Sequence, residues 1–310
     1  MAILPVGARS DKSSYMTDTV KRVMVKARGR LEEAGVDDAA FNVNCMAAAI
    51  LGVDIGQLPL HWQEMAGADF VGRLDEMVRR RCLHEPLQYI LRSWSFLDMT
   101  LVTRSGALIP RPETEEVFMA AAKAIEESIS AGRIPENFRF ADVGTGTGAL
   151  GLAMARRFVE AHGLLIDISE AALEVAAENL FAYKDVYKRV GVVRSSLLEA
   201  VRPTGLHVII SNPPYVNRGD IAALMPEVSE YEPLLALDGG TFGLDLIELL
   251  IVQAAEKLLP AGLLIFEHGH GQRAAIKELI GKDWSSCQTG DDLSARERYF
   301  ILTRKSLPNK

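Results

Sequence analysis

The chain has 310 residues, of which 48% are hydrophobic and 24% charged, and its formal net charge is −7. The length favours two domains with at least one substantial core, and the composition excludes a fibrous or largely disordered protein. The negative charge argues against a large phosphate-binding face, because nucleic-acid-binding proteins concentrate Lys and Arg on one surface. We therefore expect a protein partner and no direct nucleic-acid binding.

The sequence indicates neither secretion nor membrane insertion. The first sixteen residues lack the continuous apolar core of a secretory signal, and the most apolar helix-like run, Leu246–Ala255, is shorter than the roughly 18 residues that a membrane span requires. The cysteines Cys45, Cys82 and Cys287 are odd in number and widely spaced, so we interpret them as reduced packing residues. We expect a cytoplasmic protein.

The first third of the chain has the spacing of helices and no strand-like runs. From about Thr17 to Leu91 the apolar residues recur at helical intervals, which predicts a small helical bundle. From Trp94 to Ile109 the pattern changes to short alternating stretches separated by Arg104-Ser105-Gly106, which predicts a β-hairpin. We therefore expect a helical domain at 1–93, a hairpin linker at 94–112 and a larger domain at 113–310.

Beyond Pro112 the predicted strands and helices alternate. Helices are predicted at about Glu113–Ser128 and Ala149–Phe158. Strands are predicted at Phe138–Val143, Gly163–Asp167, Gly191–Arg194, His207–Ser211, Gly262–His268 and Tyr299–Thr303. This alternation predicts an α/β domain with a mostly parallel sheet and helices on both faces.

A glycine-rich turn follows the first predicted strand of this domain. Asp142 and Val143 lead into Gly144, Thr145, Gly146, Thr147 and Gly148, and an apolar helix comes next. Glycines at alternate positions allow a sharp turn and the close approach of a ligand. The nicotinamide fingerprint spaces its last glycine one residue further, and the tighter form resembles the cofactor loop of S-adenosylmethionine-dependent methyltransferases. Taken alone, the turn also fits a dinucleotide site or a purely structural role.

Asp167 supplies a separate indication of a nucleoside ligand. It ends the apolar run Leu164–Ile166, and a carboxylate at the end of a second strand can accept hydrogen bonds from both ribose hydroxyls. The alternative is that Asp167 only caps the helix that begins near Ser169.

The tetrapeptide Asn212-Pro213-Pro214-Tyr215 ends the fourth predicted strand, at the edge of the sheet where ligands bind. An amide nitrogen is a poor nucleophile because its lone pair is delocalised. The Asn212 side-chain oxygen and the Pro213 carbonyl can each accept one hydrogen of an NH₂ group, which aims its nitrogen at a methyl donor. The prolines fix the backbone, and the Tyr215 ring offers a flat face. The pattern predicts methyl transfer to a planar nitrogen, and a simple tight turn is the alternative.

The chain resembles the HemK/PrmC family of peptide chain release factor N5-glutamine methyltransferases. The matching segments are His84–Ile90, Ile109–Glu115, the glycine turn, Asn212–Tyr215, Tyr231–Pro233 with Ala236–Gly240, and Arg296–Arg298. The resemblance implies a Rossmann-like class I methyltransferase domain with a mostly parallel seven-stranded sheet, preceded by a helical bundle and a β-hairpin. It also implies methyl transfer from S-adenosyl-L-methionine to the N5 atom of the glutamine in a release factor's Gly-Gly-Gln loop.

The resemblance also implies roles for individual residues. The cofactor would contact Gly144, Thr145, Gly146, Thr147, Gly148, Asp167, Ser196, Leu197 and Asn212, and the glutamine would contact Asn212, Pro213, Pro214 and Tyr215, with Asn212, Pro213 and Tyr215 as the catalytic residues. The family usually has an acidic residue and a bulky one where this chain has Ser196 and Leu197. His268 and His270 lack a third ligand nearby, so we expect no metal. The helical domain is expected to recognise the release factor.

Two other acceptors fit the same chemistry. A DNA adenine-N6 methyltransferase could stack a flipped base on Tyr215, although the only basic cluster here is Arg79–Arg81, a pattern more typical of a solvated helix face. A ribosomal-protein glutamine methyltransferase is the second alternative, but that sister family usually departs from the sequence Arg111–Glu115.

Overall fold

The computed structural model describes residues 18–306, which divide into one unit that ends at Leu91 and a second that begins at Arg92. The expectation for the first sixteen residues lies outside the described part of the chain. Across residues 18–306, no single helix is long and apolar enough to cross a membrane. The segment Ala39–Leu51 reaches the required length only together with Ile55–His61, at a bend of 89°.

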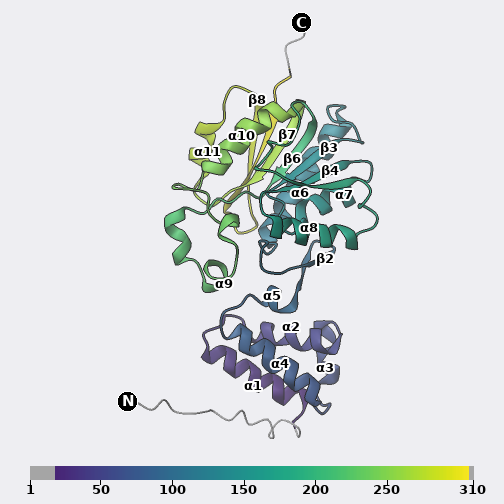
Figure 1. Cartoon of the computed structure of the whole chain (residues 1–310), viewed down its shortest axis with the longest axis vertical. Helices are drawn as coiled ribbons and strands as arrows, with labels where there is room; N and C mark the ends of the chain where they lie inside the picture. The colour runs from purple at the N-terminus through teal and green to yellow at the C-terminus, as the bar shows by residue number, and fades with distance from the viewer. Residues whose placement is uncertain (1–17, 307–310) are drawn as a thin grey trace. The chain divides into compact units, whose positions relative to one another are not determined.

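The first unit consists of helices, which confirms the predicted bundle (Figure 1). Its elements are α1 (Val20–Glu33), α2 (Ala39–Leu51), the 3₁₀ turn η2 (Ile55–Gln57), α3 (Leu58–His61), α4 (Ala68–Arg81) and α5 (Leu87–Leu91). Leu31, Met46, Leu74 and Val78 are fully or almost fully buried between the helices. The helical spacing seen in the sequence therefore corresponds to one shared apolar core.

The basic cluster at the end of α4 is only partly a solvated face. Arg79 forms an exposed hydrogen-bonded ion pair with a neighbouring glutamate of the same helix. Arg80 binds Glu85, whereas Arg81 is buried and donates through Nε to Asn42 Oδ1 at 2.8 Å. Since one guanidinium of the cluster lies in the core, the three arginines do not form a continuous phosphate-binding surface.

The second unit opens with a two-stranded hairpin, β1 (Ser93–Phe96) and β2 (Met99–Val102). Phe96 pairs with Met99, so the turn is Leu97-Asp98 and not the predicted Arg104–Gly106. Ser105 and Gly106 do form a turn, but it follows β2 and does not close the hairpin. A Cβ atom on Gly106 would lie 2.9 Å from Ala171 Cβ. Residues 107–109, also expected to be strand-like, form no strand.

A seven-stranded sheet forms the centre of the second unit (Figure 1). Its strands are β3 (Arg139–Val143), β4 (His162–Asp167), β5 (Val190–Arg194), β6 (Leu206–Ser211), β7 (Leu258–Glu267), β8 (Trp284–Asp291) and β9 (Glu297–Arg304). Their spatial order is β5-β4-β3-β6-β7-β9-β8, and β9 runs antiparallel to both of its neighbours. This arrangement confirms the predicted Rossmann-like α/β fold, with the carboxyl ends of β3, β4, β5, β6 and β7 at one edge.

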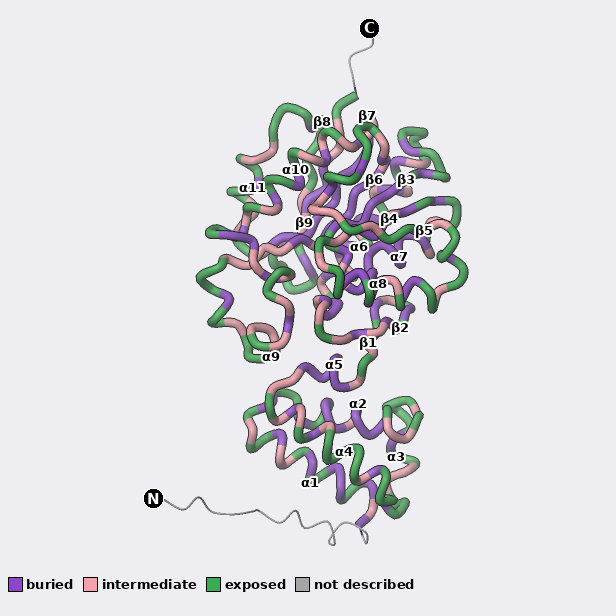
Figure 2. The backbone as a smooth tube through the Cα atoms, viewed as in Figure 1, coloured by how far each residue is buried: buried purple, intermediate pink, exposed green. Residues whose placement is uncertain are grey.

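Helices cover both faces of the sheet. The long helices are α6 (Pro112–Ser130), α7 (Ala149–Arg157), α8 (Glu170–Ala182), α10 (Asp245–Lys257) and α11 (Arg273–Leu279). Each face of the sheet has its own apolar core, and alternate residues of β3 pack into one or the other. Phe140 packs on the side of α6 and α7, and Ala141 on the side of α10 and α11. Figure 2 shows the strands as the buried centre and the outer helix faces as exposed. Between β6 and α10 the chain forms the short turns η3 (Arg218–Ala223), α9 (Pro226–Ser229) and η4 (Leu234–Ala236).

The edge strand β8 is the strand of the seven-stranded sheet that sequence patterning did not locate. Trp284 is buried, but the residues that follow it in the strand are exposed or half-buried, so no apolar alternation marks them. Cys287 lies on this strand and is exposed, so its interpretation as a packing residue was wrong. Cys45 is buried, and Cys82 is half-buried.

Candidate functional site

The glycine turn joins the end of β3 to the start of α7. Gly144, Gly146 and Gly148 have φ angles of 68°, 55° and 87°, in the left-handed region that glycine adopts without strain. The backbone N–H of Thr145 donates to the carbonyl of Ile166 at 2.9 Å, which ties the turn to the end of β4. Three alternate glycines are therefore what this backbone path requires.

Asp142 holds the turn from inside the protein. Its Oδ2 atom accepts hydrogen bonds from Thr145 Oγ1 at 2.6 Å and from the Gly151 N–H at 2.8 Å. The other oxygen is buried without a hydrogen-bond partner among the described residues, and burial raises the pKa of Asp142 to about 7. Gly151 leaves room for this carboxyl, since a Cβ atom there would lie 3.0 Å from Oδ2.

Asp167 presents its carboxylate at the end of β4. Its Oδ2 atom accepts from the Gly146 N–H at 3.0 Å and its Oδ1 atom accepts from the Ser169 N–H at 2.9 Å. A carboxylate has about four acceptor positions, so each oxygen can also accept from a ligand hydroxyl. Burial raises the pKa of Asp167. The N-cap of α8 is Ser169, whose Oγ accepts from the Ala172 N–H, so capping alone does not account for Asp167.

One cavity at the carboxyl edge of the sheet brings many of the predicted residues together. Those that line it are Gly144, Gly146, Asp167, Ser196, Leu197, Asn212 and Pro214. Thr145, Thr147, Gly148, Pro213 and Tyr215 are not part of its lining. Thr145 and Thr147 are buried, and the Thr147 carbonyl accepts from Asn179 Nδ2 at 2.9 Å. These two threonines therefore shape the turn behind the cavity wall.

Sequence reasoning missed several walls of this cavity. The additional lining residues are Gly106, Ala107, Leu108, Ile168, Ser169, Ala172, Ser195, Pro233, Leu235, Ala236 and Leu246. An ion pair joins two of the segments that line the cavity. Arg111, which follows the lining residues 106–108, donates to Glu232 Oε1 at 2.5 Å, and Glu232 directly precedes the lining residue Pro233. A usable signal was present, since Arg111, Glu232 and Pro233 all belong to segments that carry the family resemblance.

The cavity suits a nucleoside with a ribose diol. Ile168, Ala172 and Leu197 supply an apolar wall, and Asp167 supplies the hydroxyl acceptor beside the two turn glycines that line the cavity. Ser196 adds a polar hydroxyl group to this wall. These residues fit S-adenosylmethionine, which combines an adenine, a ribose and a charged tail.

The tetrapeptide after β6 is anchored through its side chains. Asn212 Nδ2 donates to Thr114 Oγ1 at 3.1 Å, and the Tyr215 hydroxyl donates to Glu267 Oε1 at 2.9 Å. Thr114 in turn donates to Glu267 Oε2 at 2.7 Å. Burial, followed by the charge of Glu267, raises the pKa of Tyr215, so the phenol stays protonated. Burial also raises the pKa of Glu267, against the hydrogen bonds from Thr114 and Tyr215.

The backbone of the tetrapeptide is held by the segment that precedes α10. The Val216 N–H donates to the Leu237 carbonyl, and the Gly239 N–H donates to the Val216 carbonyl, both at 2.9 Å. A Cβ atom on Gly239 would lie 2.8 Å from Pro214 O and from Tyr215 Cα. Only glycine allows this contact, which explains the first glycine of the pair that follows Asp238.

Comparisons with known proteins match these features. Residues 23–91 match the PrmC N-terminal domain, and residues 123–228 match the methyltransferase small domain. A release factor glutamine methyltransferase of Geobacter sulfurreducens is 32% identical over 281 residues, which cover 90% of this chain and 95% of the relative. The chain belongs to the release factor glutamine methyltransferase family. A member from Bradyrhizobium diazoefficiens is 35% identical over 251 residues, covering 81% of this chain and 82% of that protein.

A solved structure supports the fold of this family member. A methyltransferase from Pyrococcus furiosus superposes with a TM-score of 0.50 at 18% identity, covering 74% of this chain and 98% of that one. At this identity the likeness concerns the fold alone.

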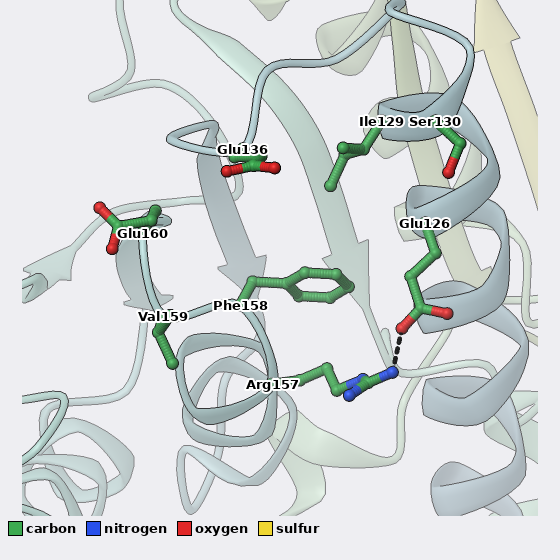
Figure 3. A pocket seen from close by; sticks show the side chains of 8 residues that line it. All are labelled: Glu126, Ile129, Ser130, Glu136, Arg157, Phe158, Val159 and Glu160. Carbon is green, nitrogen blue, oxygen red and sulfur yellow. Dashed lines mark hydrogen bonds and ion pairs between the residues drawn. The ribbon is translucent and has the colours of Figure 1, made fainter.

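A second hollow of this methyltransferase lies at the opposite edge of the sheet (Figure 3). Glu126 from α6 and Arg157 from the end of α7 form a hydrogen-bonded ion pair across it, while Glu136 and Glu160 lie at its rim. Phe158 points into the space between them in Figure 3. The hollow is distant from the glycine turn and contains none of the predicted site residues.

Proposed function

We propose that the protein transfers the methyl group of S-adenosyl-L-methionine to the N5 atom of a glutamine side chain in peptide chain release factors. Membership of the family supports this reaction. The observation that carries the acceptor chemistry is the orientation of Asn212, which lines the cavity while its NH₂ group is committed to Thr114. The amide oxygen therefore remains available to accept an N–H of an incoming amide.

The cofactor is assigned to the cavity beside the glycine turn. Gly144 and Gly146 allow close approach, Asp167 accepts the ribose hydroxyls, and Ser196 and Leu197 contact the adenine. Thr145, Thr147 and Gly148 support the turn from behind. When bound, S-adenosylmethionine supplies an electrophilic methyl group on a sulfonium sulfur.

The acceptor glutamine is assigned to the tetrapeptide. Asn212 Oδ1 and the Pro213 carbonyl accept the two hydrogens of the substrate NH₂ group, which turns its nitrogen toward the methyl donor. Pro214 keeps the chain direction fixed. The Tyr215 hydroxyl is already bonded to Glu267, so Tyr215 contributes its ring face to the substrate. Orientation, rather than acid/base chemistry, is the contribution of these residues.

The decisive measurement is labelled methyl transfer to three acceptors: a purified release factor, a ribosomal protein and duplex DNA. We expect label on the release factor glutamine, and Asn212→Ala should lower the rate at least about 100-fold because the amide loses its acceptor. Cofactor binding should persist in this variant, since the glycine turn and Asp167 are unchanged. Label on DNA alone, or full activity of the variant, would contradict the proposal.

The helical unit that ends at Leu91 is assigned to substrate recognition, and the cytoplasm, where release factors act, is the proposed location. The family match at residues 23–91 supports the first assignment. Removing the unit should abolish methylation of the intact release factor and leave the affinity for S-adenosylmethionine unchanged. Calorimetry of cofactor binding serves as the folding control. Undiminished methylation by the shortened chain would exclude this role.

A further inference from the structure

Three elements of the second unit bring Asn212, Thr114 and Glu267 into one hydrogen-bonded chain. Thr114 lies in the first turn of α6, Glu267 ends β7, and Asn212 follows β6. The exposed fractions of Thr114 and Glu267 are 5% and 1%, so water does not compete for these bonds. Buried polar chains of this kind hold side chains in defined orientations.

The direction of each hydrogen bond follows from the donors available. A carboxylate can only accept, so the single hydroxyl hydrogen of Thr114 goes to Glu267 Oε2, at 2.7 Å. The Thr114 oxygen can then only accept, and it receives a hydrogen from Asn212 Nδ2 at 3.1 Å. An amide turned by 180° would place its oxygen against an oxygen that has no hydrogen left to donate. The carboxylate therefore specifies which end of the Asn212 amide faces away from Thr114.

We propose that Thr114 and Glu267 are positioning residues that set the Asn212 side-chain amide with its oxygen toward the acceptor nitrogen. This inference rests on the proposed function, since it concerns how the glutamine amide is held. Neither residue contacts the cavity, so both act through Asn212.

The same carboxylate also holds the other end of the tetrapeptide. Glu267 Oε1 accepts the Tyr215 hydroxyl at 2.9 Å, so the two oxygens of one group fix Asn212 and Tyr215 together. Arg298 on β9 approaches Oε1 to 4.0 Å and is itself bonded to Asp292 Oδ2 at 2.8 Å. The nearby positive charge favours the ionised form that accepts from both donors.

Protonation of Glu267 would reverse this direction. A proton on Oε2 would be donated to Thr114, whose own hydrogen could then turn to Asn212 and select the opposite amide orientation. Burial is the largest effect on Glu267 and raises its pKa. Among the charged and titratable groups around it, Tyr215 and Arg298 favour ionisation, and Glu113 on α6 opposes it. We therefore expect kcat to fall on the acid side as Glu267 gains its proton.

The test compares variants that differ in one hydroxyl or one charge. Thr114→Val keeps the shape and removes the hydroxyl, Thr114→Ser keeps the hydroxyl, and Glu267→Gln leaves one acceptor oxygen for two donors. Thr303→Val on β9 and Glu126→Gln in the hollow of Figure 3 are matched controls. For each variant one measures kcat and KM with release factor, the affinity for S-adenosylmethionine and the thermal unfolding midpoint.

We expect Thr114→Val and Glu267→Gln to lower kcat by about 10- to 100-fold, because a misoriented Asn212 no longer aims the glutamine nitrogen at the methyl group. The affinity for S-adenosylmethionine should not change. Thr114→Ser should keep most of the activity, and the controls should match the wild type. The double variant Thr114→Val/Glu267→Gln should have a kcat no lower than that of the more impaired single variant, because both changes interrupt the same chain of hydrogen bonds. Glu267→Gln should also lose the acid limb of the kcat–pH profile.

Full activity of Thr114→Val, additive losses in the double variant, or an unchanged acid limb in Glu267→Gln would overturn the proposal. If Thr114→Val does not fold, the pair Thr114→Ser and Thr114→Ala gives the same comparison, since these two variants differ in the hydroxyl alone. Failure of the proposed function is distinguishable, because the wild-type protein would then place no label on the release factor.

Discussion

The two edges of the sheet use carboxylates in opposite ways, and α6 reaches both edges. At the carboxyl edge its first turn carries Thr114, which bonds the almost fully buried Glu267. At the amino edge its last turns carry Glu126, whose side chain is 44% exposed and pairs with the 57% exposed Arg157 (Figure 3). Buried carboxylates hold neighbouring groups in one direction, whereas exposed ion pairs are screened by water and contribute little. The buried carboxylate therefore fixes the geometry of the site at the carboxyl edge, whereas the exposed ion pair leaves the hollow at the amino edge without such a constraint.

The largest expected effect comes from Asp142, the most buried carboxyl of the glycine turn. Its pKa is raised from 3.8 to about 7, so the folded protein keeps a proton that the unfolded chain loses. The free energy of unfolding should therefore fall as pH rises between these two pKa values, by about 1.4 kcal/mol for each pH unit and about 4 kcal/mol at most. Asp142→Asn removes this pH dependence.

The check is urea unfolding of the wild type and Asp142→Asn between pH 4 and pH 8. The difference between the two proteins should change steadily with pH, since all other titrating groups are shared. Parallel stability curves would show that Asp142 does not titrate in this interval.

The next effect concerns ligand binding at the carboxyl edge. Asp167→Ala removes the acceptor for ribose hydroxyls and also the bonds to Gly146 and Ser169. Loss of such bonds corresponds to about 1–3 kcal/mol, or about 5- to 150-fold weaker binding of S-adenosylmethionine. Isothermal calorimetry measures this, with Glu126→Ala at the amino edge as the control. If Asp167→Ala and Glu126→Ala bound S-adenosylmethionine equally well, the carboxylate at the carboxyl edge would have no larger part in cofactor binding than the one at the amino edge.

The smallest effect is expected at the hollow of Figure 3. Glu126→Gln breaks its ion pair with Arg157, and the free energy of unfolding should change by less than about 0.5 kcal/mol. Methyl transfer should not change. A large loss of activity would show that the amino edge also takes part in function.

The sequence was sufficient to find those candidate site residues that directly follow a predicted strand. The three glycines, Asp167 and Asn212 could be found because each follows directly on an apolar strand, and strand ends meet at one edge. Thr114 could not be linked to Glu267, since 153 residues separate them and only the packing of α6 against the sheet brings them together. The turn at Ser105 and Gly106 was recognised, but it was taken for the hairpin turn because the turn signal does not show which strands the turn joins.

Because β9 runs in the reverse direction, residues near the C-terminal end of the chain reach the edge of the sheet where the cavity lies. In a purely parallel sheet that edge receives strand ends, and the segment before each strand lies on the far side. Because β9 is antiparallel, its first residues lie there instead: Tyr299 pairs with Glu267, and Arg298 reaches the same carboxylate. The residues that line the cavity all precede β9, whereas the cation beside Glu267 comes from β9 itself.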